Sequence, residues 1–158
     1  MAEFTSAVFQ NEFLPDGGTD VNAIVTIRCT GAGEAGRTGR GDAGEIVVVD
    51  ISGSMGVTNM QAAKQAAMVA LDNILDGTYF AVVAGNHKAY LAYPIVQTGA
   101  AMVRMDANTR AEAKRSISFF RAEGGTAMGT WLTLCRAVFD SIGNLGNKRV
   151  ILLTDGEN

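Results

Sequence analysis

The strongest constraint on the fold of this chain is a run of four apolar residues, Ile-Val-Val-Val at positions 46–49, that leads directly into Asp50. An unbroken apolar run rich in β-branched residues is typical of a strand buried on both faces in a parallel sheet. In open α/β sheets, the residues that follow such a strand lie in the crevice where ligands bind. Residues 50–56 therefore indicate both a fold class and a candidate site.

The residues after this predicted strand offer hard oxygen ligands. Asp50, Ser52 and Ser54 alternate along the chain, so their side chains can converge on one side of a loop that Gly53 allows to bend tightly. Carboxylate and hydroxyl oxygens suit Mg²⁺, Mn²⁺ or Ca²⁺, whereas zinc and copper favour nitrogen and sulfur. Soft ligands are scarce, because the chain has one histidine and two cysteines that are far apart in sequence. The pattern therefore predicts a site for a hard divalent cation.

Three segments resemble the von Willebrand factor A (VWA) family. The Asp-x-Ser-x-Ser pattern at 50–54 is similar to the first segment of the family's metal-ion-dependent adhesion site (MIDAS). Gly-Gly-Thr at 124–126 resembles the second segment, and Leu-Leu-Thr-Asp-Gly at 152–156 resembles the third. The resemblance implies a complete set of five metal ligands, namely Asp50, Ser52, Ser54, Thr126 and Asp155.

The same resemblance implies a function. In VWA domains the bound ion keeps one coordination position open for a carboxylate from a protein partner, so we expect a Mg²⁺-dependent adhesion or scaffold module and no enzyme. Mn²⁺ and Ca²⁺ also fit the oxygen ligands. Bacterial VWA proteins often work beside MoxR-type AAA ATPases, and the resemblance therefore suggests such an ATPase as a partner. A divalent cation would also neutralise the repulsion between the carboxylates of Asp50 and Asp155.

From residue 45 onward, strand patterns alternate with helix patterns, which predicts an α/β fold with a doubly wound (Rossmann-like), mostly parallel sheet in strand order 3-2-1-4. Asp50 and Asp155 would then end adjacent strands. We expect strands at 45–50, 78–84, 88–95 and 149–154, of which the second and third form a hairpin and the last is buried on both faces. Helices are expected over about 60–74, over about 109–121 behind a cap at Asp106 or Asn108, and after Thr126.

The chain is expected to have three parts. Residues 1–29 read as an N-terminal β extension with a turn at 11–18 and a strand at 21–29, and residues 30–44 as a glycine-rich linker. Residues 45–158 correspond to the VWA domain. Because a complete VWA domain continues past Asp155, the resemblance predicts a truncated domain that lacks its last helices and strands. Its last strand would then expose a sheet edge through which the chain can self-associate.

Composition excludes several classes of function. The net charge of −3, with 13 basic residues scattered among 16 acidic ones, argues against nucleic acid as a partner. No apolar run approaches the length of a membrane span, and the N-terminus lacks the pattern of a secretory signal. Two cysteines that look unpaired fit a reducing compartment, so we expect a cytoplasmic protein.

Each candidate ligand also has a structural interpretation. Thr126 could cap the third helix, Ser52 and Ser54 could cap the first, and Asp155 could open a turn. A serine hydrolase with Ser54 as nucleophile remains an alternative, although the order of His87 and Asp155 does not fit its triad. A metal-dependent phosphatase is another, although it would need a second aspartate where Ser52 stands. A structural module with a non-functional site is a third alternative. The single histidine, His87, is expected in the hairpin turn.

Overall fold

The structure is a computed structural model that describes residues 3–10, 23–30, 42–95 and 100–156. The chain divides into two compact units, Met1–Gly39 and Arg40–Asn158. The first unit contains two antiparallel strands, β1 (Glu3–Gln10) and β2 (Ala23–Thr30). The strand predicted at 21–29 is thus found as β2, whereas the predicted turn at 11–18 and most of the predicted linker lie outside the described residues.

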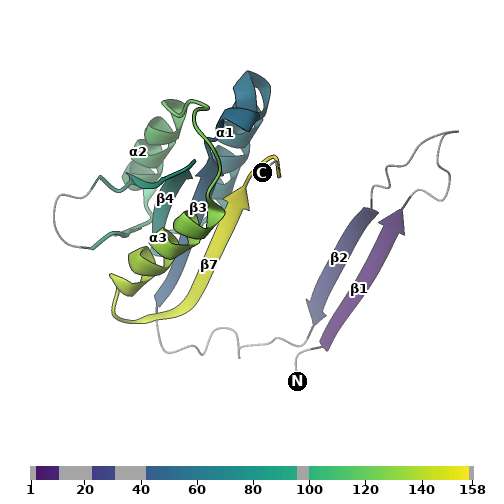
Figure 1. The fold of residues 1–158 in the computed structure, drawn as a ribbon. Coiled ribbons are helices and arrows are strands. Elements are labelled where there is room, and N and C mark those ends of the chain that lie inside the picture. The colour runs from purple at the N-terminus through teal and green to yellow at the C-terminus, as the bar shows by residue number, and fades with distance from the viewer. Residues whose placement is uncertain (1–2, 11–22, 31–41, 96–99, 157–158) are drawn as a thin grey trace, which may run out of the picture. The chain divides into compact units, whose positions relative to one another are not determined.

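The second unit is built around a mixed sheet. Its elements in chain order are β3 (Asp42–Asp50), the short 3-10 helix η2 (Gly53–Met55), α1 (Gly56–Asn73), β4 (Tyr79–Gly85), β5 (Ala89–Tyr93), β6 (Val103–Arg104), α2 (Ala107–Ser118), α3 (Met128–Asp140) and β7 (Leu145–Leu153). The strand order is β5-β4-β3-β7, and β6 also pairs with β4 (Figure 1). Central β3 is parallel to β4 and β7, whereas β4 and β5 form an antiparallel hairpin. If the two-residue β6 is left out of the count, the order along this unit is the 3-2-1-4 arrangement that the sequence predicts, and the α/β fold class is confirmed.

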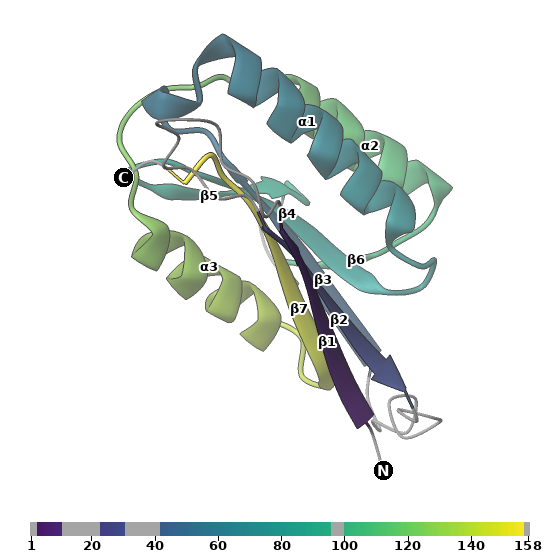
Figure 2. The ribbon, with the colours of Figure 1, turned by 90° about the vertical axis from the view of Figure 1, so that its right-hand side faces the viewer.

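Helices cover both faces of the sheet, with α1 and α2 on one side and α3 on the other (Figure 2). The apolar residues of β3 alternate between two cores because successive side chains of a strand point to opposite faces. Val47 and Val49 pack toward α1 and α2, whereas Ile46 and Val48 pack with Trp131 of α3. This sandwich buries β3 completely from Ile46 to Asp50 and fixes the position of Asp50 at its end. Among the described residues, no helix has the length and apolar character needed to cross a membrane.

The helix starts show one confirmed cap and one correction. Asp106 caps α2: its carboxylate accepts a hydrogen bond from the Thr109 backbone at 2.8 Å, and the Thr109 hydroxyl accepts one from the Asp106 backbone at 2.9 Å. These hydrogen bonds hold the pKa of Asp106 below its usual value, because they favour the charged carboxylate. The suggestion that Thr126 caps the third helix is wrong, because the N-cap of α3 is Ala127, which has no capping oxygen.

Strand β7 differs from the prediction of a strand buried on both faces. Leu153 packs against the core under α1, but Val150 and Leu152 remain 37% and 39% exposed on the other side. The apolar pattern of residues 150–153 predicts that they form a strand. Whether both faces of the strand are buried depends on which elements pack against it. The exposure of Val150 and Leu152 shows that the predicted burial on both faces is incorrect. Among the described residues, β3 is the only strand that pairs with β7.

Candidate metal-binding site

The first segment of the site is a loop anchored by Asp50, whose side chain is fully buried. One carboxylate oxygen of Asp50 accepts a hydrogen bond from the Ser52 backbone at 2.8 Å. The hydroxyls of Ser52 and Ser54 lie 3.0 Å apart, so the three oxygen-bearing residues predicted from the alternating pattern do converge. The backbone of Ile51 continues the pairing of β3 with β4 by donating to Gly85 at 2.8 Å. The sheet itself therefore positions this loop.

The second segment, residues 123–127, is hydrogen-bonded directly to the first. The Gly53 backbone donates to Gly124 at 2.7 Å, and the Glu123 backbone donates to Ile51 at 2.8 Å. Gly124 has a φ of +76°, and a Cβ atom there would lie 2.5 Å from Nδ1 of His87. Both its conformation and the close approach of His87 require glycine. The first glycine of the Gly-Gly-Thr pattern is thus explained by its conformation and its contact with His87.

A residue that sequence analysis missed holds the second segment in place. Asn86, at the end of β4, is 1% exposed, and its side-chain amide donates to the Glu123 carbonyl at 3.1 Å. Its side-chain oxygen accepts from the Lys88 backbone at 2.9 Å, which closes the hairpin turn. Its backbone carbonyl accepts from the Ala127 backbone at 3.0 Å and from the Trp131 indole at 2.7 Å. The sequence identified this position only as part of a turn, because its partners are far away in the chain.

The third segment contacts the site through Thr154, the neighbour of the predicted ligand Asp155. The Thr154 hydroxyl donates to the second carboxylate oxygen of Asp50 at 2.7 Å, so this hydroxyl is a functional group that the sequence did not indicate. Asp155 is half-buried and accepts a hydrogen bond from the amide of Asn59 on α1 at 3.5 Å. Because β3 and β7 are adjacent and parallel, Asp155 follows the strand next to the one that Asp50 ends. The predicted adjacency of the two strand ends is therefore observed.

The five predicted ligands thus lie on three segments that are hydrogen-bonded to one another. Asp50, Ser52 and Ser54 share one loop, Thr126 lies on a segment bound to that loop, and Asp155 follows the threonine that contacts Asp50. Of the other reactive groups, His87 lies against Gly124 of the second segment. A hydrolase triad would need a hydrogen bond between His87 and Ser54, and the described part of the chain contains no such bond. Cys135 is buried in α3, and burial raises the pKa of its thiol to about 11.

The chemistry of these residues fits a hard divalent cation. Neighbouring ligands of an octahedral ion with metal–oxygen distances of about 2.0 to 2.1 Å are about 2.9 Å apart. The 3.0 Å between the Ser52 and Ser54 hydroxyls matches that spacing. Within the described residues, no three His, Cys, Asp or Glu side chains cluster as metal ligands. An ion held here would therefore rely on hydroxyl oxygens as well as on carboxylates.

Comparison with known proteins identifies the family. The sequence model of the von Willebrand factor type A domain family matches residues 46–157, which include all three segments. The chain belongs to the VWA family. VWA domains are typically metal-dependent protein-interaction modules, which agrees with the oxygen-rich site described above. No curated protein sequence matches the chain.

Solved structures support the same assignment. A von Willebrand factor type A protein from Catenulispora acidiphila is 38% identical, with a TM-score of 0.65, and the match covers 93% of this chain and 32% of that one. Proximal thread matrix protein 1 from the mussel byssus, in a form with a zinc-occupied MIDAS motif, is 28% identical with a TM-score of 0.55 over 76% of this chain and 30% of that one. BatB from Bacteroides thetaiotaomicron shares the fold at 22% identity, with a TM-score of 0.57 over 73% of this chain and 55% of that one. The match thus spans about a third of the length of the Catenulispora acidiphila protein.

The hydrogen bonds of Asn86 predict that this residue stabilises the second segment of the site, and substitution of Asn86 tests the prediction. Replacing Asn86 with alanine removes both side-chain hydrogen bonds, which are partly buried, and leaves the Glu123 carbonyl without that donor. We expect a loss of about 2 to 3 kcal/mol in the free energy of unfolding, since buried groups that lose their partners cost about 1 to 3 kcal/mol each. Urea unfolding measures this loss, and hydrogen exchange should show faster exchange of the amides of 123–127.

Asn73 on α1 provides the matched control for this experiment. Its amide also donates to a carbonyl, that of Val69 at 2.8 Å, but this bond is exposed. The Asn73→Ala variant should change the free energy of unfolding by no more than about 0.5 kcal/mol. Equal effects of the two substitutions would show that Asn86 does not organise the second segment.

Proposed function

We propose that this VWA domain binds one divalent cation through Asp50, Ser52, Ser54, Thr126 and Asp155, and that the bound cation captures an acidic side chain of a protein partner. The observation that carries the proposal is the position of Asp50. Its buried carboxylate accepts hydrogen bonds from both the first and the third segment, and the first segment is bonded to the second. These contacts bring three distant parts of the chain to one place.

The residues around the site have separable roles in this proposal. Asp50 and Asp155 supply negative charge, and the three hydroxyls supply neutral oxygens. A bound cation would provide a coordination position for a carboxylate from outside. Asn86 and Thr154 act through other residues: Asn86 holds the segment that carries Thr126, and Thr154 orients the carboxylate of Asp50. Burial of Asp50 strengthens its interaction with a cation, because the surrounding dielectric is lower than that of water.

Mg²⁺ is the proposed ion, with Mn²⁺ and Ca²⁺ as the other candidates. Carboxylates and hydroxyls are the ligands that these hard cations prefer. The mussel protein is described with zinc in its MIDAS motif, which shows that a VWA site can accept another metal. Competition between Mg²⁺, Mn²⁺, Ca²⁺ and Zn²⁺ therefore belongs in the first binding experiment.

The domain is proposed to bind and not to catalyse. A serine hydrolase would need a base beside Ser54, whereas the Ser54 hydroxyl contacts the Ser52 hydroxyl. A phosphatase of the aspartate-dependent type would need a second carboxylate at the position of Ser52. A MoxR-type AAA ATPase is a candidate partner by family resemblance alone. Incubation with phosphate and acyl esters should give no turnover above that of an Asp50→Asn variant.

Calorimetric titration of chelator-treated protein with MgCl₂ tests the metal site. We expect one site, and stabilisation by about 1.4 kcal/mol when free Mg²⁺ is about tenfold above its dissociation constant. An Asp155→Asn variant should bind Mg²⁺ at least about tenfold more weakly, because it removes one of two charged ligands. Titrations that show no Mg²⁺, Mn²⁺ or Ca²⁺ binding by the wild-type protein would contradict the proposal.

A further inference from the structure

The cations of the second unit fall into two groups. Most of them pair with a carboxylate; these pairs are Arg104–Asp42, Arg110–Asp76, Lys114–Asp72, Arg136–Asp140, Lys148–Asp140 and Arg149–Glu45. Within the described residues, four cations lie in no such pair: Lys64, Lys88, Arg115 and Arg121. These four unpaired cations leave local positive charge on a chain whose net charge is negative.

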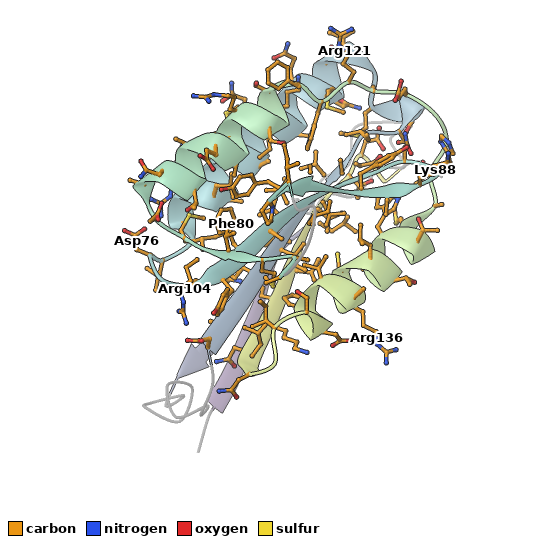
Figure 3. The ribbon with its side chains drawn as sticks, turned by 90° about the vertical axis from the view of Figure 1, so that its left-hand side faces the viewer. Asp76, Phe80, Lys88, Arg104, Arg121 and Arg136 are labelled. Atoms are coloured by element: carbon orange, nitrogen blue, oxygen red, sulfur yellow. The ribbon has the colours of Figure 1, made fainter. Side chains whose placement is uncertain are left out.

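Two of these cations, Lys88 and Arg121, lie next to segments of the candidate site, whereas Arg115 lines a separate cavity beside Tyr93 and Phe119. Figure 3 shows Lys88 and Arg121 at one end of the unit, and Asp76 and Arg104 toward the other. Lys88 belongs to the turn that Asn86 closes, directly after β4. Arg121 is exposed and precedes the segment that carries the Gly-Gly-Thr pattern. The nearby acid, Glu123, forms no ion pair with either cation in the described part of the chain.

A groove leads away from the site between two of these cations. It has a volume of about 360 Å³ and is lined by Gly53, Gly56, Val57, Met60, Gln61, Lys64, Phe120, Arg121 and Ala122. It therefore begins at the loop that contains Ser52 and Ser54 and continues along the first half of α1. The ammonium of Lys64 donates to the Ser118 carbonyl at 2.9 Å, which positions it while leaving further donors available.

The groove also offers an apolar contact. Val57 at its rim is 81% exposed, and Met60 in its wall is buried. A groove that is lined by an exposed valine and by two unneutralised cations favours a ligand that combines negative charge with an apolar side chain. A peptide has both, whereas inorganic phosphate or a sugar phosphate lacks the apolar part.

We propose that the groove receives the partner segment that supplies the carboxylate to the cation, and that this segment carries a second acidic residue for Lys64 or Arg121 and an apolar residue between the two acids. This inference rests on the proposed function. The helix from Gly56 to Lys64 rises about 12 Å. An extended peptide covers about 3.3 to 3.6 Å per residue, so the two acids should be about three or four residues apart.

Selection of short random peptides displayed on phage tests this inference. The probe is the peptide library on immobilised full-length chain in MgCl₂, with elution by a chelator. We expect eluted peptides to be enriched in two acidic residues at the stated spacing with an apolar residue between them. Enrichment of a single acidic residue without the second would overturn the inference while supporting the metal site.

Charge reversal then tests the groove with an enriched peptide carrying a fluorescent label. Lys64→Glu and Arg121→Glu should each weaken binding by about three- to tenfold, and the wild-type affinity should fall with added salt. Arg136→Glu is the matched control: it makes the same change in charge on α3, far from Arg121 in Figure 3. This control should stay within about twofold of wild type.

The two hypotheses fail in different ways. Unchanged affinity in both groove variants would overturn the inference and leave the metal site intact. Failure to elute any peptide with chelator, together with no heat of Mg²⁺ binding, would contradict the proposed function.

Discussion

Replacing Asp50 with asparagine is expected to abolish the response of the protein to divalent cations. Asparagine keeps the shape of the side chain and can still accept a hydrogen bond from the Ser52 backbone or the Thr154 hydroxyl. It lacks the negative charge, and a buried neutral amide attracts a cation far less than a buried carboxylate does. We expect Mg²⁺ affinity to fall by at least about 100-fold, because the loss of one outer-shell contact already costs about 10- to 100-fold. Calorimetry and Mg²⁺-dependent melting curves measure this loss.

The control for this variant is Asp140→Asn at the end of α3. Asp140 is exposed and paired with Lys148 and Arg136, so its replacement changes net charge equally without touching the site. Mg²⁺ affinity should stay within about twofold of wild type in this control. If Asp50→Asn also retains wild-type affinity while its circular dichroism is unchanged, the ion does not bind at this loop.

The second large effect is expected from Gly85→Ala at the end of β4. A Cβ atom at this position would lie 2.4 Å from two carbons of the Trp131 ring and 2.6 Å from its nitrogen. The ring is fully buried, and its N–H donates to the Asn86 carbonyl at 2.7 Å. Trp131 therefore cannot move aside without losing a hydrogen bond and disturbing the packed core of α3. We expect a loss of about 2 to 4 kcal/mol in the free energy of unfolding.

Urea denaturation measures this effect, and Gly129→Ala in α3 is its matched control. No atom lies within 4 Å of a Cβ built at Gly129. Because alanine lowers the entropy of the unfolded chain and favours helix, this control should be neutral or stabilising by up to about 1 kcal/mol. Equal stability of the Gly85→Ala and wild-type proteins would mean that Trp131 is not held where the structure places it.

The parts of this structure that could be predicted are those with a local signature. The apolar run before Asp50 and the alternation of strands and helices were enough to predict the central strand and the order of the sheet. Strand β7 was identified by the same kind of pattern, yet its burial was predicted incorrectly. Exposure of Val150 depends on which elements cover it, and the residues of one strand carry no information about that.

The candidate site was predictable to the extent that its residues belong to a known motif. Ser52 and Ser54 converge as their spacing indicates. Asn86 and Thr154 were missed, because their importance comes from contacts with residues that are distant in sequence. The start of α3 was misjudged for a similar reason. The Ala127 backbone is held by the Asn86 carbonyl, so a tertiary contact replaces the side-chain cap that Thr126 suggested.

The position of β3 between two parallel neighbours has a mechanical consequence. Its residues from Gly44 to Asp50 pair with β4, and those from Asp42 to Val49 pair with β7. A force that pulls on Asp50 along the strand would load the hydrogen bonds to both β4 and β7 in shear. Many hydrogen bonds would then share the force and would have to break together. A tether attached at this point would therefore resist pulling much better than one attached to β5, which within the described residues pairs with β4 alone.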